Sequence, residues 1–401
     1  MPNEIKNWKL NVAVFLSGQC ITLFGSMLVH YAILWHITLT AQSGVAMMLL
    51  SVSMAVPMFL VSPFAGVWAD RYSKRLLICV ADAGIAAITL MMAVLFSLGF
   101  EYMALLMVCI AARGLGQGIQ APTVNSFLPE IVPAGSLLRI NGINASMQSA
   151  IMFGSPIAGG VLIALLPVQT ALYIDVITAV IGISLLLLFV KSPQKIKNEE
   201  HETFREMIEG LKYIKSHAFI KKLLLISVLF NLLITPAALL TPLQVVRNFG
   251  ADEWRLVVIE LAFFGGMTVG GLLIGVWGGF KNKSNTMAFA IIMSGLFISG
   301  LGILKIFALY VMCFFLAGVS TPVFNAPAMT LIQIKIDPDV LGRVFSVLMM
   351  LSSITMPIGM LAWGPLADIV PIDWLLIISG AGILSISAFF ILDRTLREAG
   401  R

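Results

Sequence analysis

The stretch that decides the fold lies between two apolar runs and reads Gly66-Val67-Trp68-Ala69-Asp70-Arg71-Tyr72-Ser73-Lys74-Arg75. One acid followed by several basic residues marks a short polar connection, and positive charge of this kind is retained on the cytoplasmic face of a membrane. Gly66 would let a neighbouring helix approach closely. Asp70 is suited to face the N-terminus of another helix, which carries partial positive charge. The stretch therefore predicts a cytoplasmic connection between two membrane-spanning helices.

Long apolar runs recur along the whole chain. Of its 401 residues, 59% are apolar and 11% are charged, whereas soluble domains average about 45–50% and about 25%. Such runs must be helices, because lipid offers no partners to free backbone groups. This composition disfavours a soluble globule, a nucleic-acid binder and a disordered chain. It predicts an all-α membrane protein with twelve transmembrane helices, at 11–38, 44–69, 75–98, 102–121, 138–165, 167–190, 219–247, 256–280, 286–304, 306–330, 341–367 and 374–393.

The basic residues predict how these helices are oriented. With the N-terminus in the cytoplasm, nearly all of the 25 lysines and arginines fall in cytoplasmic segments. Only Arg247, Arg255 and Lys305 fall outside, and Arg113 lies within a span. Such a bias indicates that both termini are cytoplasmic, which requires an even number of spans. We expect a multi-pass protein of the bacterial cytoplasmic membrane.

A polar stretch near the middle of the chain predicts the domain organisation. It divides the spans into a first six-helix bundle at 1–190, a linker at 191–218 and a second six-helix bundle at 219–401. Within the linker, an apolar stripe at helical spacing predicts an amphipathic helix on the cytoplasmic membrane surface, although a solvated linker helix fits equally well. The stripe consists of Phe204, Met207, Ile208, Leu211 and Ile214. An Ala-Pro pair at 121–122 recurs at 326–327, which supports duplication of a six-helix unit.

The fifth predicted span carries a second motif, Gly154-Ser155-Pro156-Ile157-Ala158-Gly159-Gly160. Pro156 removes one helix hydrogen bond and permits a kink. Gly159 and Gly160 allow tight helix packing. A kink that serves packing alone is the alternative to a functional hinge.

Ionisable residues within the spans are candidates for proton coupling, namely Asp82, Arg113 and Glu260. An unpaired arginine in a membrane costs at least about 2.5–3.5 kcal/mol, so Arg113 should have a partner. Counted along the helices, Arg113 lies about 18 Å from one face and Asp82 about 10 Å from the other, nearly level in a core of about 30 Å. We therefore predict that Asp82 pairs with Arg113, directly or through Asp70. For Asp175 we expect a structural role, and for Glu260 a proton site or a surface acid.

The motifs together resemble those of a known family. The stretch at 66–75 resembles the GxxxDRxGRR loop of the major facilitator superfamily, with Ser73 where the family usually has glycine. The stretch at 154–160 resembles the GPxxGG motif of its antiporter branch, with Ser155 before the proline, and 111–118 resembles its arginine motif. The resemblance covers the whole chain and is greatest to the macrolide efflux subgroup, as in Asn7-Trp8-Lys9 and Leu341-Gly342-Arg343-Val344-Phe345-Ser346.

This resemblance implies two bundles that rock about a central site, usually as a monomer. It implies proton-driven export of lipophilic compounds such as macrolides, and it makes Gly66, Asp70, Arg71, Lys74 and Arg75 a cytoplasmic gate. It also implies which spans line the substrate cavity. Their polar residues near mid-depth are Gln19, Asn231, Thr235 and Asn325.

Other functions remain open at this point. A lipid, siderophore or metabolite carrier on the same fold fits the motifs as well, since fold does not fix substrate. An enzyme is disfavoured because the chain has no GxSxG, HExxH or GxxxxGK[ST] motif, and its cysteines form no metal cluster. We expect no cofactor, no metal and no catalytic residue. The expected partners are the bilayer, a small lipophilic solute and protons, whereas nucleic acid is not expected.

Overall fold

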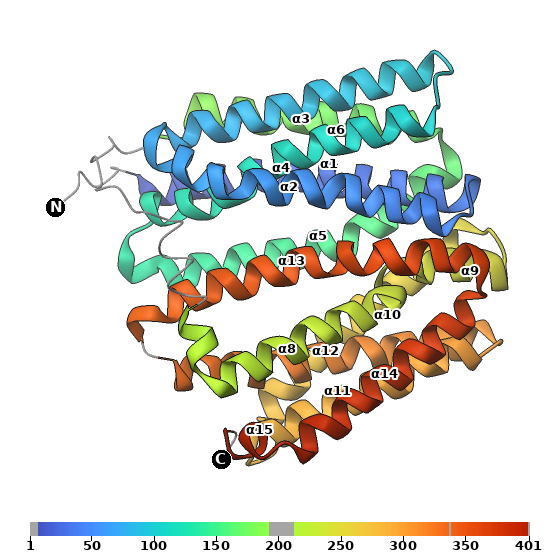
Figure 1. The fold of residues 1–401 in the computed structure, drawn as a ribbon. Coiled ribbons are helices and arrows are strands. Elements are labelled where there is room, and N and C mark those ends of the chain that lie inside the picture. Colours follow the sequence, from blue (N-terminus) through green and yellow to red (C-terminus); the bar gives the residue numbers. More distant parts are fainter. Residues whose placement is uncertain (1–6, 192–211, 337, 400–401) are drawn as a thin grey trace. The chain divides into compact units, whose positions relative to one another are not determined.

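A computed structural model describes residues 7–191, 212–336 and 338–399, and in these residues helices are the only regular secondary structure (Figure 1). Twelve of the helices are long and apolar enough to span a membrane. The predicted all-α architecture of twelve spans is thereby confirmed, with most boundaries within a few residues. Helix α4 is the exception, because it continues ten residues beyond its predicted end at 121.

The helices are bounded as follows. The first six spans are α1 (Trp8–Thr40), α2 (Gly44–Arg71), α3 (Lys74–Ser97), α4 (Met103–Ile131), α5 (Leu137–Leu165) and α6 (Val168–Phe189), with a short 3-10 turn η1 (Ala134–Ser136) before α5. The later elements are α8 (Ala218–Thr235), η2 (Pro236–Leu240), α9 (Thr241–Phe249), α10 (Glu253–Trp277), α11 (Lys283–Ile303), α12 (Phe307–Lys335), α13 (Pro338–Ile369), α14 (Ile372–Leu392) and α15 (Arg394–Ala399).

The chain divides into two compact units. Unit 1 consists of Met1–His36 and Leu49–His201, and unit 2 consists of Ile37–Met48 and Glu202–Arg401. The end of α1, the following turn and the start of α2 therefore pack with unit 2, although they fall inside the predicted first bundle. Most of the predicted amphipathic stripe, from Phe204 to Leu211, lies outside the described residues, whereas Ile214 is described and buried.

Unit 1 is held together around α3, which packs against α4 and α6. Its apolar core includes Phe15 of α1 and Phe127 of α4, whose ring centroids lie 5.2 Å apart in an edge-to-face arrangement. Asn11 closes this end of the core, because its side chain exchanges hydrogen bonds with the backbone of Lys191 at 3.1 and 2.7 Å. This frame fixes the positions of the polar side chains described below.

Unit 2 depends on two close helix pairs, α10 with α12 and α11 with α14. Between α10 and α12 the backbones touch. A Cβ atom added to Gly266 would lie 2.0 Å from the carbonyl oxygen of Phe315, and one added to Gly270 would lie 2.3 Å from that of Val319. The span formed by α8, η2 and α9 is interrupted by the π-helical turn η2, which begins at Pro236. A proline and a π turn both disturb the regular hydrogen-bond ladder of a helix.

Candidate functional site

A buried ion pair lies at the centre of unit 1. Nη1 of Arg113 on α4 donates to Oδ2 of Asp175 on α6 at 2.7 Å, and the two side chains are 6% and 1% exposed. The Thr89 hydroxyl of α3 accepts from Arg113 and lies 3.2 Å from the same carboxylate oxygen. Ser26 of α1 donates to Oδ1 of Asp175 at 3.2 Å. Four helices thus converge on one neutral pair, which compensates the cost of burying both charges.

The predicted pairing of Arg113 with Asp82 is wrong, because the partner is Asp175. The error comes from the assumed depth scale. Helix α3 has 24 residues, which at about 1.5 Å per residue is about 36 Å rather than 30 Å. Arg113 is therefore level with Thr89, two turns further along α3 than Asp82. The prediction that Arg113 needs a buried carboxylate partner is nevertheless met by the structure.

Asp82 belongs to a second polar layer. It is 3% exposed, and the side chain of Gln120 on α4 lies near its carboxylate. The same Gln120 amide donates to Oε1 of Gln19 on α1 at 3.1 Å. Among the described residues Asp82 forms no ion pair, and the charged group that acts on it is the carboxylate of Asp175.

The two layers repeat at a fixed interval along three helices. Gln19 and Ser26 on α1, Asp82 and Thr89 on α3, and Gln120 and Arg113 on α4 are each separated by seven residues. Seven residues are about two helical turns, or about 10.5 Å, so each pair shares one face of its helix. This spacing is visible in the sequence, and it is the signal by which Ser26, Thr89 and Gln120 could have been found. The alignment produces one polar column inside an apolar bundle.

A small hollow adjoins the layer that contains Arg113. It is lined by Ser26, Val29, His30, Ile33, Leu50, Met54, Ile110, Arg113 and Gln117. Five of these nine side chains are apolar, and Ser26, His30, Arg113 and Gln117 stand among them. Because Arg113 both pairs with Asp175 and lines the hollow, a solute there would meet the ion pair directly.

The basic residues of the decisive stretch tie helices together within unit 1. Lys74 donates to the Ser126 carbonyl at 3.1 Å and pairs with Glu130 at 2.7 Å, both on α4. Arg75 donates to the Leu187 carbonyl of α6. Asp70 lies in the last turn of α2, which ends at Arg71.

The glycine at the start of that stretch does not behave as expected. A Cβ atom added to Gly66 would meet no atom of the described chain within 4 Å. No described residue makes the close helix approach predicted at Gly66.

The motif at 154–160 packs α5 against α1. A Cβ atom added to Gly159 would lie 3.3 Å from Cβ of Tyr31 and 3.6 Å from the ring of Trp35. Ser155 is fully buried one turn earlier, and its hydroxyl has no hydrogen-bond partner among the described residues. Pro156 stands inside α5 without ending it, so the helix continues through the motif.

The remaining candidates lie in separate places. Gln19 is engaged in the polar layer. On α8, Asn231 donates to the Ser227 carbonyl and Thr235 to the Asn231 carbonyl, each at 2.8 Å, so both side chains bond to their own helix. Asn325 of α12 is exposed. Glu260 of α10 is half-buried and makes no hydrogen bond or ion pair with the described residues.

Known proteins resemble this chain over nearly its whole length. Residues 10–360 match the Major Facilitator Superfamily. Macrolide efflux protein A of Streptococcus pyogenes is 29% identical over 393 residues, or 96% of each chain. Macrolide efflux protein A of Enterococcus faecalis is 31% identical over 324 residues, or 78% of this chain and 99% of its own.

A mutant of the nucleoside transporter NupG shares the fold, with a TM-score of 0.77 at 13% identity over 96% of this chain and 99% of that chain. The family match and the twelve apolar spans agree with one another. The chain therefore belongs to the Major Facilitator Superfamily, and it is a multi-pass membrane transporter rather than an enzyme.

Proposed function

We propose that this transporter is a proton-coupled exporter of lipophilic compounds such as macrolides, working by alternating access. The observation that carries the proposal is the polar column of unit 1. It contains the neutral pair Arg113–Asp175 and a further buried acid, Asp82, which forms no ion pair among the described residues. Ionisable groups inside a membrane are expensive and mark proton or ion pathways. The identity to macrolide efflux proteins supports the substrate class.

Asp82 is the proton carrier in this proposal. Ionised, it leaves one uncompensated negative charge in the column, and protonated, it leaves none. A proton can shift a conformational equilibrium only by binding the two states with different affinity. The Gln120 amide can follow such a change, because it can donate to the carboxylate and its oxygen can accept from the carboxylic acid. Glu260 is a second candidate, since it has no partner among the described residues.

The apolar hollow beside Arg113 is the proposed place where solute meets the column. A lipophilic compound with carbonyl, ether or hydroxyl groups suits it, because Arg113 and Gln117 offer N–H donors beside aliphatic walls. Gln19, Asn231, Thr235 and Asn325 remain candidates for the wider cavity. The positive-inside bias supports cytoplasmic termini in a bacterial cytoplasmic membrane. Asp70, Arg71, Lys74 and Arg75 would then gate the cytoplasmic side.

Transport in proteoliposomes tests the proposal. With the pH gradient imposed so that protons run down into the solute-donor compartment, purified transporter should move a labelled macrolide, and a protonophore should abolish the movement. Asp82→Asn should remove the gradient-driven part while counterflow exchange persists. Glu253→Gln, an acid at the start of α10, is the matched control and should transport normally.

Three outcomes contradict the proposal. Transport at the same rate with and without the pH gradient would contradict proton coupling. Gradient-driven transport by Asp82→Asn would show that Asp82 is not the proton carrier. Failure to move any macrolide, with gradient-driven uptake of a siderophore, lipid or other metabolite, would instead favour that alternative substrate class.

A further inference from the structure

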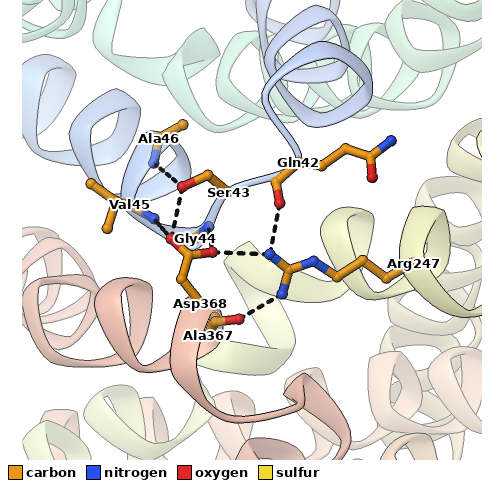
Figure 2. A network of polar contacts seen from close by, with 8 residues as sticks. All are labelled: Gln42, Ser43, Gly44, Val45, Ala46, Arg247, Ala367 and Asp368. Carbon is orange, nitrogen blue, oxygen red and sulfur yellow. Dashed lines mark hydrogen bonds and ion pairs between the residues drawn. The ribbon is translucent and has the colours of Figure 1, made fainter.

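The turn between α1 and α2 is bound to the end of α13 by a helix cap (Figure 2). Oδ1 of Asp368 accepts the Gly44 N–H at 2.7 Å. Oδ2 of Asp368 accepts the Val45 N–H at 3.0 Å and the Ser43 hydroxyl at 2.7 Å. Free N–H groups at a helix N-terminus carry partial positive charge, so a carboxylate placed there is stabilised. Asp368 thus supplies to α2 a cap that comes from a residue 324 positions away in the sequence.

Arg247, at the end of α9, fastens the same contact from the other side (Figure 2). Its Nη2 donates to Oδ1 of Asp368 at 2.9 Å and to the Gln42 carbonyl at 2.6 Å. Its Nη1 donates to the Ala367 carbonyl at 2.5 Å. One guanidinium therefore joins α9, the last turn of α13 and the α1–α2 turn. Hydrogen bonds between charged groups are stronger than those between neutral ones.

Two glycines bring the backbones close enough for this cap. A Cβ atom added to Gly44 would lie 2.2 Å from the Gly364 carbonyl oxygen. One added to Gly364 would lie 2.6 Å from Cβ of Met48. No other residue type fits at either position without a shift of the backbone. The contact is therefore built into the sequence at two independent points, the glycine pair and the Asp368–Arg247 pair.

All residues of this contact belong to unit 2. Residues Ile37–Met48 pack with unit 2, whereas the rest of α1 and α2 belongs to unit 1. Any movement of unit 1 against unit 2 must therefore bend α1 and α2 near residues 36 and 49 or release the turn from unit 2. Release is feasible, because Asp368 and Arg247 are each 28% exposed and can exchange their partners for water.

We propose that Asp368 and Arg247 form a releasable latch, which holds the α1–α2 turn in one state of the transport cycle and frees it in the other. The same signature, Gly-x-x-Ala-Asp, ends both helices of interest, at 364–368 in α13 and at 66–70 in α2. Helix α2 therefore receives one such acid at its start and carries another at its end. The latch lies on the face that the basic residues predict to be extracellular. The latch proposal rests on the alternating access of the proposed function. It depends neither on proton coupling nor on the identity of the substrate.

A distance measurement without substrate or gradient tests the latch. Spin labels are placed at Val45→Cys and Ile369→Cys, both exposed positions beside the latch, after the four native cysteines are replaced by alanine. Asp368→Asn and Arg247→Gln should each raise the fraction of molecules at the longer label distance about fivefold or more, because each removes charge-assisted bonds.

Asp373→Asn is the matched control. Asp373 lies five residues further along, and it accepts hydrogen bonds from Gln244, Asn248 and Lys305, all within unit 2. Its loss should leave the distance distribution unchanged. The proposal is overturned if both latch variants keep the wild-type distribution, or if Asp373→Asn shifts it equally. If Asp368→Asn does not fold, Arg247→Gln decides, since the cap on α2 is intact in that variant. Loss of macrolide transport with a normal latch response would instead count against the proposed substrate.

Discussion

The main effect of replacing Asp175 with asparagine would be to leave its partner, Arg113, buried without a counter-charge in the core of unit 1. Breaking a buried pair by removing one partner costs about 3–5 kcal/mol, far more than the pair itself contributes. We therefore predict that Asp175→Asn strongly lowers the unfolding temperature of the purified protein, followed by intrinsic tryptophan fluorescence.

The double variant separates this effect from lost packing. Arg113→Met combined with Asp175→Asn removes both charges, so it should recover much of the lost stability. If the double variant is less stable than Asp175→Asn alone, the uncompensated charge is not the cause. A transport assay on the double variant then reports how much of the coupling depends on the pair.

At the scale of single residues, the sequence predicts which charged side chains are energetically costly to bury. It does not predict which of them form an ion pair. Arg113 had to have a partner, and the prediction considered Asp82 and Asp70 but gave Asp175 only a structural role. The choice among them depends on helix length and on rotation about the helix axis. A single sequence supplies neither with the accuracy of one turn. The seven-residue spacing in α1, α3 and α4 would have narrowed the choice, since it aligns Arg113 with Thr89 rather than Asp82.

Helix α10 shows how small residues set the distance between two elements. We predict that Gly266→Ala lowers the unfolding temperature, because the new methyl group would lie 2.0 Å from the Phe315 carbonyl oxygen. Forcing α12 away in this manner costs about 1–3 kcal/mol.

Gly271 provides the control in the same helix, since a Cβ atom there meets no atom of the described chain within 4 Å. Gly271→Ala should be neutral or stabilising by up to about 1 kcal/mol, because alanine loses less conformational freedom in a helix than glycine. Equal destabilisation by the two variants would contradict the close approach of α10 and α12.

The end of α14 carries a pH-dependent contact outside the spans. Oδ2 of Asp393 accepts from Nζ of Lys222 at 2.6 Å, and this hydrogen bond lowers the pKa of the Asp393 carboxyl. A carboxyl whose pKa is lower in the folded state stabilises that state above its unfolded pKa of about 3.9. The contribution is lost as the pH falls through the lower, folded value.

Asp393→Asn should therefore be less stable than wild type at pH 7, by less than about 1 kcal/mol because the pair is partly exposed. Well below the folded pKa of Asp393 the two proteins should unfold at the same temperature. Thermal unfolding at both pH values checks this, and a difference that persists at the acidic pH would assign the effect to packing.

At the scale of elements the spans were predictable because lipid leaves a chain few choices. Uninterrupted apolar length locates each helix. Helix α4 was underestimated because its last ten residues contain two prolines, Pro122 and Pro129, and four polar residues. Thr123 bonds to its own helix instead, donating to the Ile119 carbonyl at 2.6 Å, so polarity there does not end the helix. The π turn at Pro236 and the cap on α2 depend on contacts that no local pattern records.

The boundary between the two compact units differs from the one that the sequence predicts. The polar linker at 191–218 is a compositional signal, whereas the assignment of Ile37–Met48 to unit 2 follows from Asp368, Arg247 and the glycine pair. These residues are distant in sequence from the turn that they hold. The sequence shows which side chains could form a cap or an ion pair. It does not show that they contact the α1–α2 turn, because that contact depends on the fold.

The last prediction joins the polar column of unit 1 to the latch. If both respond to one two-state equilibrium, a proton on Asp82 and release of the α1–α2 turn must influence each other equally, because linkage is reciprocal. The distance distribution between labels at Val45→Cys and Ile369→Cys should then change with pH in the wild-type background. It should be independent of pH when Asp82→Asn is added. If the pH dependence persists in Asp82→Asn but disappears in Glu260→Gln, the proton site is Glu260 on α10. The latch proposal would be unaffected by that result.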